Sequence, residues 1–258
     1  MELFVETQVY WLANVLMLVM VLSFCYLNSH PAHYGRYTSN RSFGLVINPR
    51  VAWFVQECPS FFVPVTLLLH EWKQIRPVNL VLLGFFIMHY WYRVFLYPWK
   101  LSTNRSVPFS IVLAAFCFTS INGYLQAMDL CHVMQYDSSY VVRFPFVLGM
   151  IMACTGWSVN WHSDRILTGL KRSSPVDQQR YVIPQGGLFA YVSCANYFGE
   201  CLEWIGWAIA TQSRGGLCFA VCTCCNLVPR ALTHHAWYHQ TFGSSYPSNR
   251  RALVPFLL

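Results

Sequence analysis

Charged residues are scarce in this chain of 258 residues, at 10% of the total, whereas a typical soluble domain carries about 25%. Hydrophobic residues make up 55%. So few charges cannot cover a globule of this size, which argues against a soluble enzyme, and so apolar a composition argues against disorder. The aromatic fraction of 17% suits a protein with many side chains anchored at membrane–water interfaces.

The sequence also lacks the signs of a signal peptide, of a disulfide framework and of a Rossmann dinucleotide site. The first apolar run, about residues 8–28, has no basic segment before it and no good cleavage site, so we expect a retained membrane span rather than a signal peptide. The eleven cysteines are odd in number and irregularly spaced, which argues against a disulfide framework. No G-x-G-x-x-G motif follows a predicted strand, which excludes a Rossmann dinucleotide site.

What the chain does have is a series of apolar runs, at 9–27, 51–70, 78–97, 106–128, 144–163, 187–210 and 215–229. A span needs about 20 apolar residues, and the first five runs meet this plainly. The sixth contains acids. The seventh is short, so either residues 230–242 complete it as a span or it is a partly interfacial segment. We predict one all-α domain over 1–258, a polytopic membrane protein with seven transmembrane helices, because lone strands leave their backbone unsatisfied in lipid.

The net charge of +7 fits this topology better than nucleic-acid binding, because the basic residues lie between the apolar runs. With the N-terminus in the lumen and the C-terminus in the cytosol, seven spans put four basic residues on the lumenal side. The cytosolic side then holds twelve, namely Arg36, Arg41, Arg50, Lys100, Arg105, Arg165, Lys171, Arg172, Arg180, Arg230, Arg250 and Arg251. This bias follows the positive-inside rule, and six spans would break it.

Two polar side chains in the second and third runs point to chemistry. Glu57 is an acid within a span, where charge is costly and is usually paired or functional. Tyr90 lies near the end of the third run, and a phenol beside an acid can polarise a carbonyl in a dry site. The alternatives are a structural hydrogen bond for Glu57 and an interfacial aromatic belt for Tyr90, the reading that we favour for Trp91 and Tyr97.

Polar residues also gather in the C-terminal half. Asn160 and Asp164 are four apart and share a helix face, as do Asn196 and Glu200. The basic residues Lys171, Arg172 and Arg180 follow the first pair. They form either a phosphate site at the membrane surface or an ordinary solvated loop after a capped helix.

Histidines and cysteines near the C-terminus raise the question of a metal. His235 and His239 have the spacing of a helical metal pair. The remaining histidines form no further H-x-x-H-H group, and the cysteines of 218–225 lie in an apolar run without a second cluster. We therefore predict no metal site and assign the cysteines to packing.

Several blocks of sequence match one family in order and spacing. They are A-W-F-V-Q-E at 52–57, H-Y at 89–90, N-G-Y-L-Q at 122–126, N-W-H-S-D at 160–164, I-P-Q-G-G-L-F at 183–189, A-N-Y-F-G-E at 195–200 and the segment 250–256. From about residue 34 onward the chain closely resembles the steroid 5α-reductases (3-oxo-5α-steroid 4-dehydrogenases). The blocks around Glu57 and Tyr90 favour this branch over the enoyl-CoA and polyprenol reductases, which share mainly the C-terminal pattern.

The resemblance implies a seven-helix enzyme of the endoplasmic reticulum membrane that uses NADPH to reduce the C4–C5 double bond of 3-oxo-Δ4-steroids. Glu57 and Tyr90 would bind the C3 carbonyl. The NADPH-binding half would be about 144–258, and the implied cofactor residues are Arg105, Asn160, Asp164, Lys171, Tyr181, Asn196, Glu200, Arg230, His234 and Tyr238. We expect a lipophilic steroid and membrane lipid as partners, no nucleic acid, and a monomer.

Two positions depart from the family pattern. Val182 stands where a basic residue usually follows the tyrosine of Y-x-I-P, and Lys171 stands where arginine is common. A lysine is a point charge rather than a fork, so these changes bear on NADPH affinity and not on the type of reaction. The alternatives are reduction of another enone, such as a trans-2-enoyl-CoA or a polyprenol precursor, a sterol-binding protein without catalysis, and a transporter or receptor.

Overall fold

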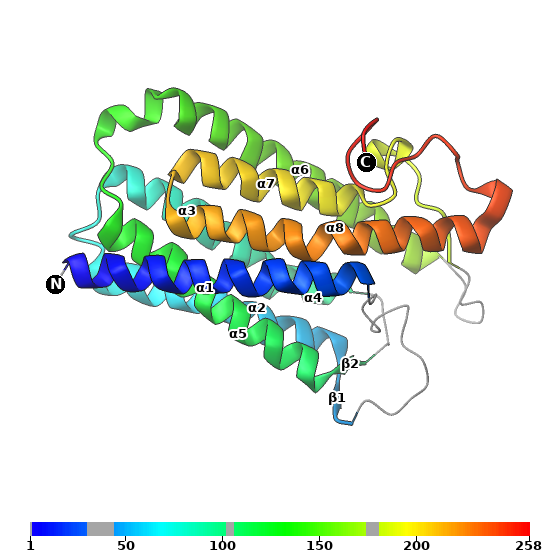
Figure 1. Cartoon of the computed structure of the whole chain (residues 1–258), viewed down its shortest axis with the longest axis horizontal. Coiled ribbons are helices and arrows are strands. Elements are labelled where there is room, and N and C mark those ends of the chain that lie inside the picture. Colours follow the sequence, from blue (N-terminus) through cyan, green and yellow to red (C-terminus); the bar gives the residue numbers. More distant parts are fainter. Residues whose placement is uncertain (1, 30–43, 102–105, 174–180) are drawn as a thin grey trace. The chain divides into compact units, whose positions relative to one another are not determined.

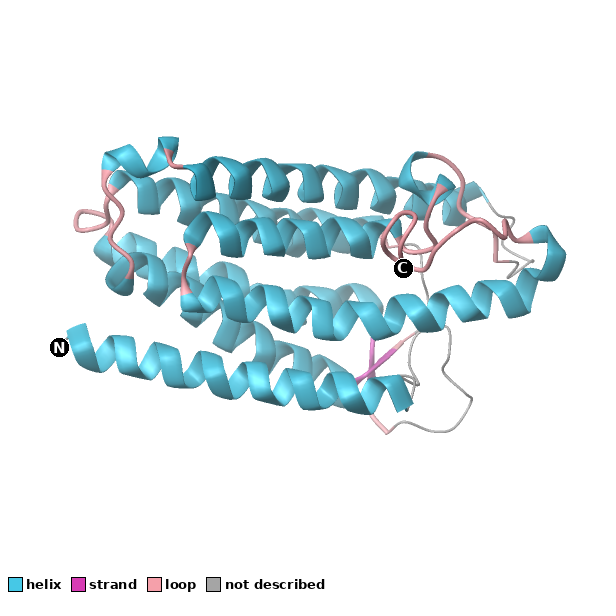
Figure 2. Ribbon diagram, turned by 45° about the horizontal axis from the view of Figure 1, so that its top comes forward, coloured by secondary structure: helices cyan, strands magenta, loops and turns pink. Residues whose placement is uncertain are grey.

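The computed structural model describes residues 2–29, 44–101, 106–173 and 181–258, and nearly all of them are helical (Figures 1 and 2). The main helices are α1 (Glu2–Ser29), α2 (Pro49–Glu71), α3 (Pro77–Trp91), α5 (Phe109–Met128), α6 (Phe144–Ser173), α7 (Ala195–Thr211) and α8 (Arg214–Phe242). Most of each apolar run therefore lies in a helix, as predicted, but the run 187–210 becomes an α-helix only from Ala195, and the run 106–128 only from Phe109. The last two stretches, 215–229 and 230–242, form one continuous helix.

Short elements extend or join these helices. A π-helical turn (Tyr92–Leu96) and α4 (Tyr97–Lys100) continue α3, and a second π-helical turn (Asp129–Val133) continues α5. The strands β1 (Val46–Ile47) and β2 (Val107–Pro108) pair antiparallel. Three 3₁₀ turns complete the described part, at Ser138–Val142, Gly187–Ala190 and Gly243–Ser245.

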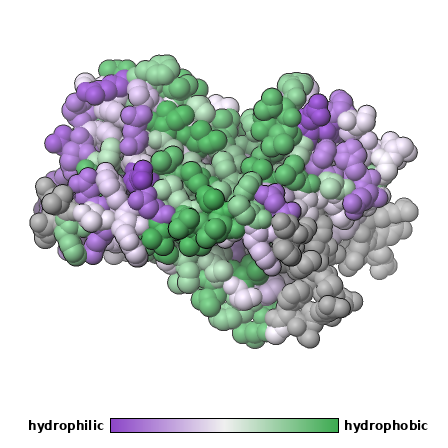
Figure 3. Space-filling view, viewed as in Figure 1, coloured by the Kyte–Doolittle hydropathy of each residue, from purple (hydrophilic) through white to green (hydrophobic). Residues whose placement is uncertain are grey.

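Five of the described segments are long and apolar enough to cross a membrane, namely Phe4–Asn28, Pro49–Glu71, Pro77–Lys100, Phe109–Val133 and Arg214–Ser245. Apolar side chains also cover much of the visible helix surface (Figure 3). These features indicate a multi-pass membrane protein. Seven spans are not confirmed, because neither α6 nor α7, which has only 17 residues, is among these five segments.

The chain divides into two compact units. The first consists of Met1–Val15, His33–Phe146 and Thr211–Cys218, and the second of Leu16–Ala32, Val147–Ala210 and Phe219–Leu258. The residues expected to bind a carbonyl, Glu57 and Tyr90, lie in the first unit. Most of the residues expected to bind a cofactor lie in the second.

Buried polar contacts fix the first unit around α5. The Asn79 amide of α3 donates to the carbonyls of Leu130 at 2.8 Å and Met134 at 2.7 Å, just where the π-helical turn leaves backbone oxygens without helical donors. In the following loop, burial raises the pKa of the Tyr136 phenol, which stays protonated and donates to the carbonyl of Thr211.

The same end of α5 holds the first turn of α8. The carboxylate of Asp129, which is fully buried, accepts the Gly215 N–H at 2.5 Å. The Gln126 amide donates to the Gly215 carbonyl at 2.8 Å, and Ser213 accepts the Gly216 N–H at 3.0 Å. An acid and a hydroxyl thus satisfy orphan donors at a helix N-terminus, where the helix dipole favours negative charge.

In the second unit, α6 and α7 touch backbone to backbone. Gly149 and Gly156 on α6 face Gly206 and Gly199 on α7. A Cβ atom on Gly156 would lie 2.6 Å from the Gly199 carbonyl oxygen and would collide with the backbone nitrogen of Glu203. Small residues at such spacing let two helices approach closely without the hydrophobic effect that lipid removes.

The C-terminal segment closes over the turn that precedes α7. Gly186 and Gly187 have φ angles of +88° and +52°, a backbone conformation that glycine adopts readily, and the chain turns there. Arg251 forms a parallel bridge with Val192, and the buried Arg250 guanidinium donates to the Pro184 carbonyl at 3.0 Å. The chain end is therefore part of this unit rather than an extension of it.

Candidate functional site

The first part of the site lies on α2 and α3, which pack against each other. Glu57 sits mid-way along α2 and is half-buried. Tyr90, near the end of α3, is 4% exposed, and its ring packs against Phe86 with centroids 4.8 Å apart. The structure thus places an acid and a phenol on neighbouring helices within segments that can span a membrane.

A buried cation lies one turn after Tyr90 and contacts a tryptophan one turn before Glu57. Arg93 follows Tyr90 by three residues and is 8% exposed. Its guanidinium carbon lies 4.6 Å from the ring centroid of Trp53, one turn before Glu57, and 4.6 Å from that of Tyr97. The aromatic faces stabilise a cation that lipid would not. Sequence reasoning assigned Arg93 no role and read Tyr97 as an interface anchor.

The second part of the site is a polar cluster where α6 meets α7. The amide of Asn160 donates to the Asn196 carbonyl at 3.0 Å and to the Glu200 carboxylate at 3.2 Å. The amide of Asn196 donates to Asp164 at 3.4 Å. Asn160 and Asp164 are each 3% exposed, so the glycine-mediated contact of the two helices brings four predicted site residues together.

Three more predicted residues lie four apart on α8. Arg230, His234 and Tyr238 therefore share one face of that helix. His234 Nε2 lies 3.4 Å from the hydroxyl of Tyr197, the residue after Asn196. The α8 face is thereby joined to the α7 end that carries the polar cluster.

The remaining predicted cofactor residues are placed less fully. Tyr181 is 38% exposed, and its ring lies 4.8 Å from that of Trp237 on α8. Arg105 and the side chain of Lys171 lie outside the described residues.

The histidines next to this face make other contacts. His235 Nδ1 lies 2.6 Å from the Ser193 hydroxyl, which also bonds the Tyr246 hydroxyl at 2.6 Å. The His235 and His239 rings lie 4.6 Å apart. Within the described residues, no three histidine, cysteine or acidic side chains gather as a metal site would require. All eleven cysteines are free thiols.

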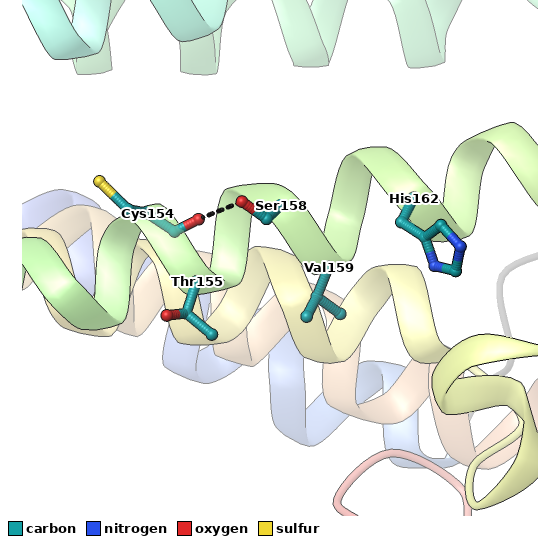
Figure 4. Close-up of a pocket in the computed structure, with 5 residues that line it drawn as sticks. All are labelled: Cys154, Thr155, Ser158, Val159 and His162. Atoms are coloured by element: carbon teal, nitrogen blue, oxygen red, sulfur yellow. Dashed lines mark hydrogen bonds between the residues drawn. The ribbon is translucent and has the colours of Figure 1, made fainter.

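A hollow of about 400 Å³ lies along the more exposed face of α6, away from the buried Asn160 and Asp164 (Figure 4). Its lining residues, Cys154, Thr155, Ser158, Val159 and His162, all come from that one helix. The Ser158 hydroxyl donates to the Cys154 carbonyl of its own helix at 2.8 Å. With a single wall and none of the predicted site residues, this hollow is a surface groove rather than an enclosed site.

Comparison with known proteins identifies the family. Residues 105–258 match the family model described as 3-oxo-5-alpha-steroid 4-dehydrogenase. The chain is 40% identical over 229 residues to the human protein named 3-oxo-5-alpha-steroid 4-dehydrogenase 2, covering 88% of each chain. It is 37% identical over 233 residues to steroid 5-alpha-reductase DET2 of Arabidopsis thaliana, covering 88% of this chain and 87% of the relative. The chain belongs to the 3-oxo-5α-steroid 4-dehydrogenase family.

Membership of the 3-oxo-5α-steroid 4-dehydrogenase family confirms the resemblance that was inferred from the sequence blocks. The family model covers residues 105–258, and the relatives from human and Arabidopsis thaliana align over 88% of the chain, but neither match assigns a role to a side chain. The roles of individual residues therefore stay predictions, to be argued from their chemistry.

Proposed function

We propose that this protein reduces the C4–C5 double bond of 3-oxo-Δ4-steroids to 5α-steroids, with NADPH as the hydride donor. Family membership carries the proposal, since the relatives from human and Arabidopsis thaliana are named for that reaction and align over 88% of this chain. The apolar helices support it, because a steroid partitions into lipid and can reach a site from the membrane.

The carbonyl-binding role belongs to Glu57 and Tyr90. As C5 of the enone receives hydride, the electron pair of the double bond moves toward the C3 oxygen, and C4 then takes a proton as the carbonyl re-forms. Protonated Glu57 and Tyr90 would donate hydrogen bonds to that oxygen while its negative charge builds. Their position away from water strengthens such bonds.

The polar cluster of the second unit fits a dinucleotide. Bound NADPH would supply the hydride. Asn196 and Glu200, which present amide and carboxylate groups, suit a carboxamide at the nicotinamide end, with Asn160 and Asp164 fixing their orientation. Arg230, together with Arg105 and Lys171, would neutralise phosphates. His234, Tyr238 and Tyr181 would complete the site with ring and hydroxyl contacts.

We place the protein in the endoplasmic reticulum membrane as a monomer, with its N-terminus in the lumen and its C-terminus in the cytosol. The excess of basic residues in the segments assigned to the cytosol supports this orientation. It would also put the basic residues on the side from which polyanionic NADPH arrives.

The test is an assay of detergent-solubilised protein with NADPH and a panel of enones: testosterone, progesterone and a long trans-2-enoyl-CoA. We expect 5α-reduced steroid by mass spectrometry. Turnover of the enoyl-CoA alone would move the chain to the fatty-acid elongation branch. Steroid binding without any reduction would contradict an enzymatic role.

A further inference from the structure

The helical turn that carries Glu57 is interrupted by Pro59. Proline has no N–H, so the Val55 carbonyl four residues earlier lacks its helical donor. The Cys58 thiol approaches that carbonyl at 3.3 Å. Although α2 continues through Pro59, a turn that lacks one backbone hydrogen bond is held less firmly by its own helix, so contacts from a neighbouring helix matter more for the position of its side chains.

That support comes from one turn of α5. The Thr119 hydroxyl donates to the Gln56 carbonyl at 2.6 Å, and the Ser60 hydroxyl donates back to the Thr119 carbonyl at 2.9 Å. A Cβ atom on Gly123 would lie 3.0 Å from the Pro59 carbonyl oxygen, so the two backbones nearly touch there. We call this set of contacts the Thr119 clasp.

The Thr119 clasp brackets Glu57 in sequence. Its two hydrogen bonds attach to the residue just before Glu57 and to the residue three positions after it. Both hydroxyl-bearing residues are buried, with Ser60 fully enclosed and Thr119 5% exposed. The contacts hold the backbone of the turn, and leave the carboxyl group itself to other partners.

Ordinary helix packing would not require this arrangement. Hydroxyl groups in spans often bond only to their own helix, as Thr66 does with the Phe62 carbonyl at 2.8 Å and Ser120 with the Phe116 carbonyl at 2.7 Å. The Thr119 hydroxyl has such a partner in Phe116 at 3.1 Å, yet its shorter bond is to α2.

We propose that Thr119 is a positioning residue for the reduction, which acts through Glu57 by fixing the turn on which that acid stands. This inference rests on the proposed function. A misplacement of about 1 Å at a reacting centre can lower the rate by about 10²-fold, so partial loosening of the turn should show in turnover. Because the contact with the carbonyl strengthens in the transition state, the effect should fall on kcat more than on KM.

The experiment compares Thr119→Val with Thr119→Ser, which keeps the hydroxyl, and with the control Thr66→Val. The control makes the same substitution on a hydroxyl that bonds only within α2. We expect Thr119→Val to lower kcat by roughly tenfold, with KM for testosterone and the Kd for NADPH changed by less than about threefold. Thr119→Ser and Thr66→Val should stay within about twofold of the parent protein.

A double-mutant cycle with Glu57→Gln separates positioning from general damage. If Thr119 acts through Glu57, Thr119→Val should have almost no further effect once the acid is gone. A tenfold loss in both backgrounds, or no loss in either, would overturn the inference. If Thr119→Val does not fold, Ser60→Ala removes the other bond of the clasp and enters the same cycle. A parent protein that reduces none of the steroids would instead overturn the proposed function.

Discussion

Glu57 and Tyr90 are the residues on which the proposed chemistry depends most directly. We expect Glu57→Gln and Tyr90→Phe each to lower steroid turnover at least about tenfold. Tyr90→Phe removes a donor from the oxygen that becomes negative, and Glu57→Gln replaces the acidic O–H by an amide N–H, which is a weaker donor that cannot transfer its proton. NADPH should still bind, since most of the proposed cofactor residues lie in the second unit. Steady-state kinetics and NADPH titration by fluorescence measure the two effects separately.

Glu71→Gln is the matched control for the acid. Glu71 lies at the end of the same helix and pairs with His132 at 2.8 Å, away from the turn of Glu57. Turnover of this variant should be close to that of the parent protein. Near-normal rates in both Glu57→Gln and Tyr90→Phe, with folded protein, would refute the proposed roles.

Asn160 tests the polar cluster in the same way. Its amide links Asn196 to Glu200, so Asn160→Ala should leave both groups less well oriented. Loss of a buried hydrogen bond costs about 1 kcal/mol or somewhat more, which predicts NADPH affinity reduced about fivefold to tenfold. The control is Ser158→Ala on the same helix, whose hydroxyl bonds only to its own backbone. Equal affinities in the two variants would argue against a cofactor role for the cluster.

At the residue scale, the sequence was most informative where polar groups stand out against an apolar background. Glu57 and Asp164 are visible in that way, and the structure finds both in helices where burial needs a partner or a purpose. Arg93 carried the same signal but was left without a role, because its aromatic neighbours come from two different helices. The Thr119 clasp was invisible, since a threonine in an apolar run gives no sign of which backbone it will bond.

At the scale of elements, the contact between α6 and α7 depends on glycine. Gly156→Ala should lower stability by about 1–3 kcal/mol, because its Cβ meets backbone atoms that cannot move aside. For a chain of this size the midpoint of thermal unfolding should fall by about 2–4 °C for each kcal/mol. A melt of the detergent-solubilised protein followed by tryptophan fluorescence measures it.

Gly169→Ala is the control on the same helix. A Cβ atom at Gly169 would have nothing within 4 Å, and alanine is the better helix former by about 1 kcal/mol. Its midpoint should be unchanged or higher. A fall of the same size in both variants would mean that helix propensity, not close packing, decides the stability of this pair.

The boundaries of elements were harder to predict than their presence. Apolar runs predicted helices because a bilayer leaves few other ways to satisfy the backbone. The sequence could not tell whether 230–242 continued the last run, since His234, His235 and Arg230 lower its hydropathy. The structure makes it one helix, α8, whose first turn is fixed by Asp129 from a distant part of the chain.

At the scale of the whole molecule, the number of spans decides on which side of the membrane the turn between α6 and α7 lies. If both helices cross, as we predict, residues 181–194 face the cytosol and can meet NADPH. If neither crosses, the same residues stay with the loop at 134–143 in the lumen, although the C-terminus is cytosolic in both cases. The charges of Asp137 and Arg143, which pair at 3.3 Å in that loop, do not decide between them.

A glycosylation reporter decides between the two topologies. A long Gly/Ser insert with an N-x-S acceptor placed at Asp137 should be glycosylated, because both topologies put that loop in the lumen. The same insert at Tyr191, which is 45% exposed, should stay unmodified if α6 and α7 both span. Glycosylation of an insert slows the protein on a gel, and endoglycosidase treatment should abolish that shift. Modification at Tyr191 would reduce the spans to five and put the proposed NADPH site on the wrong side of the membrane. An unmodified insert at Asp137 would instead show that the predicted orientation is inverted.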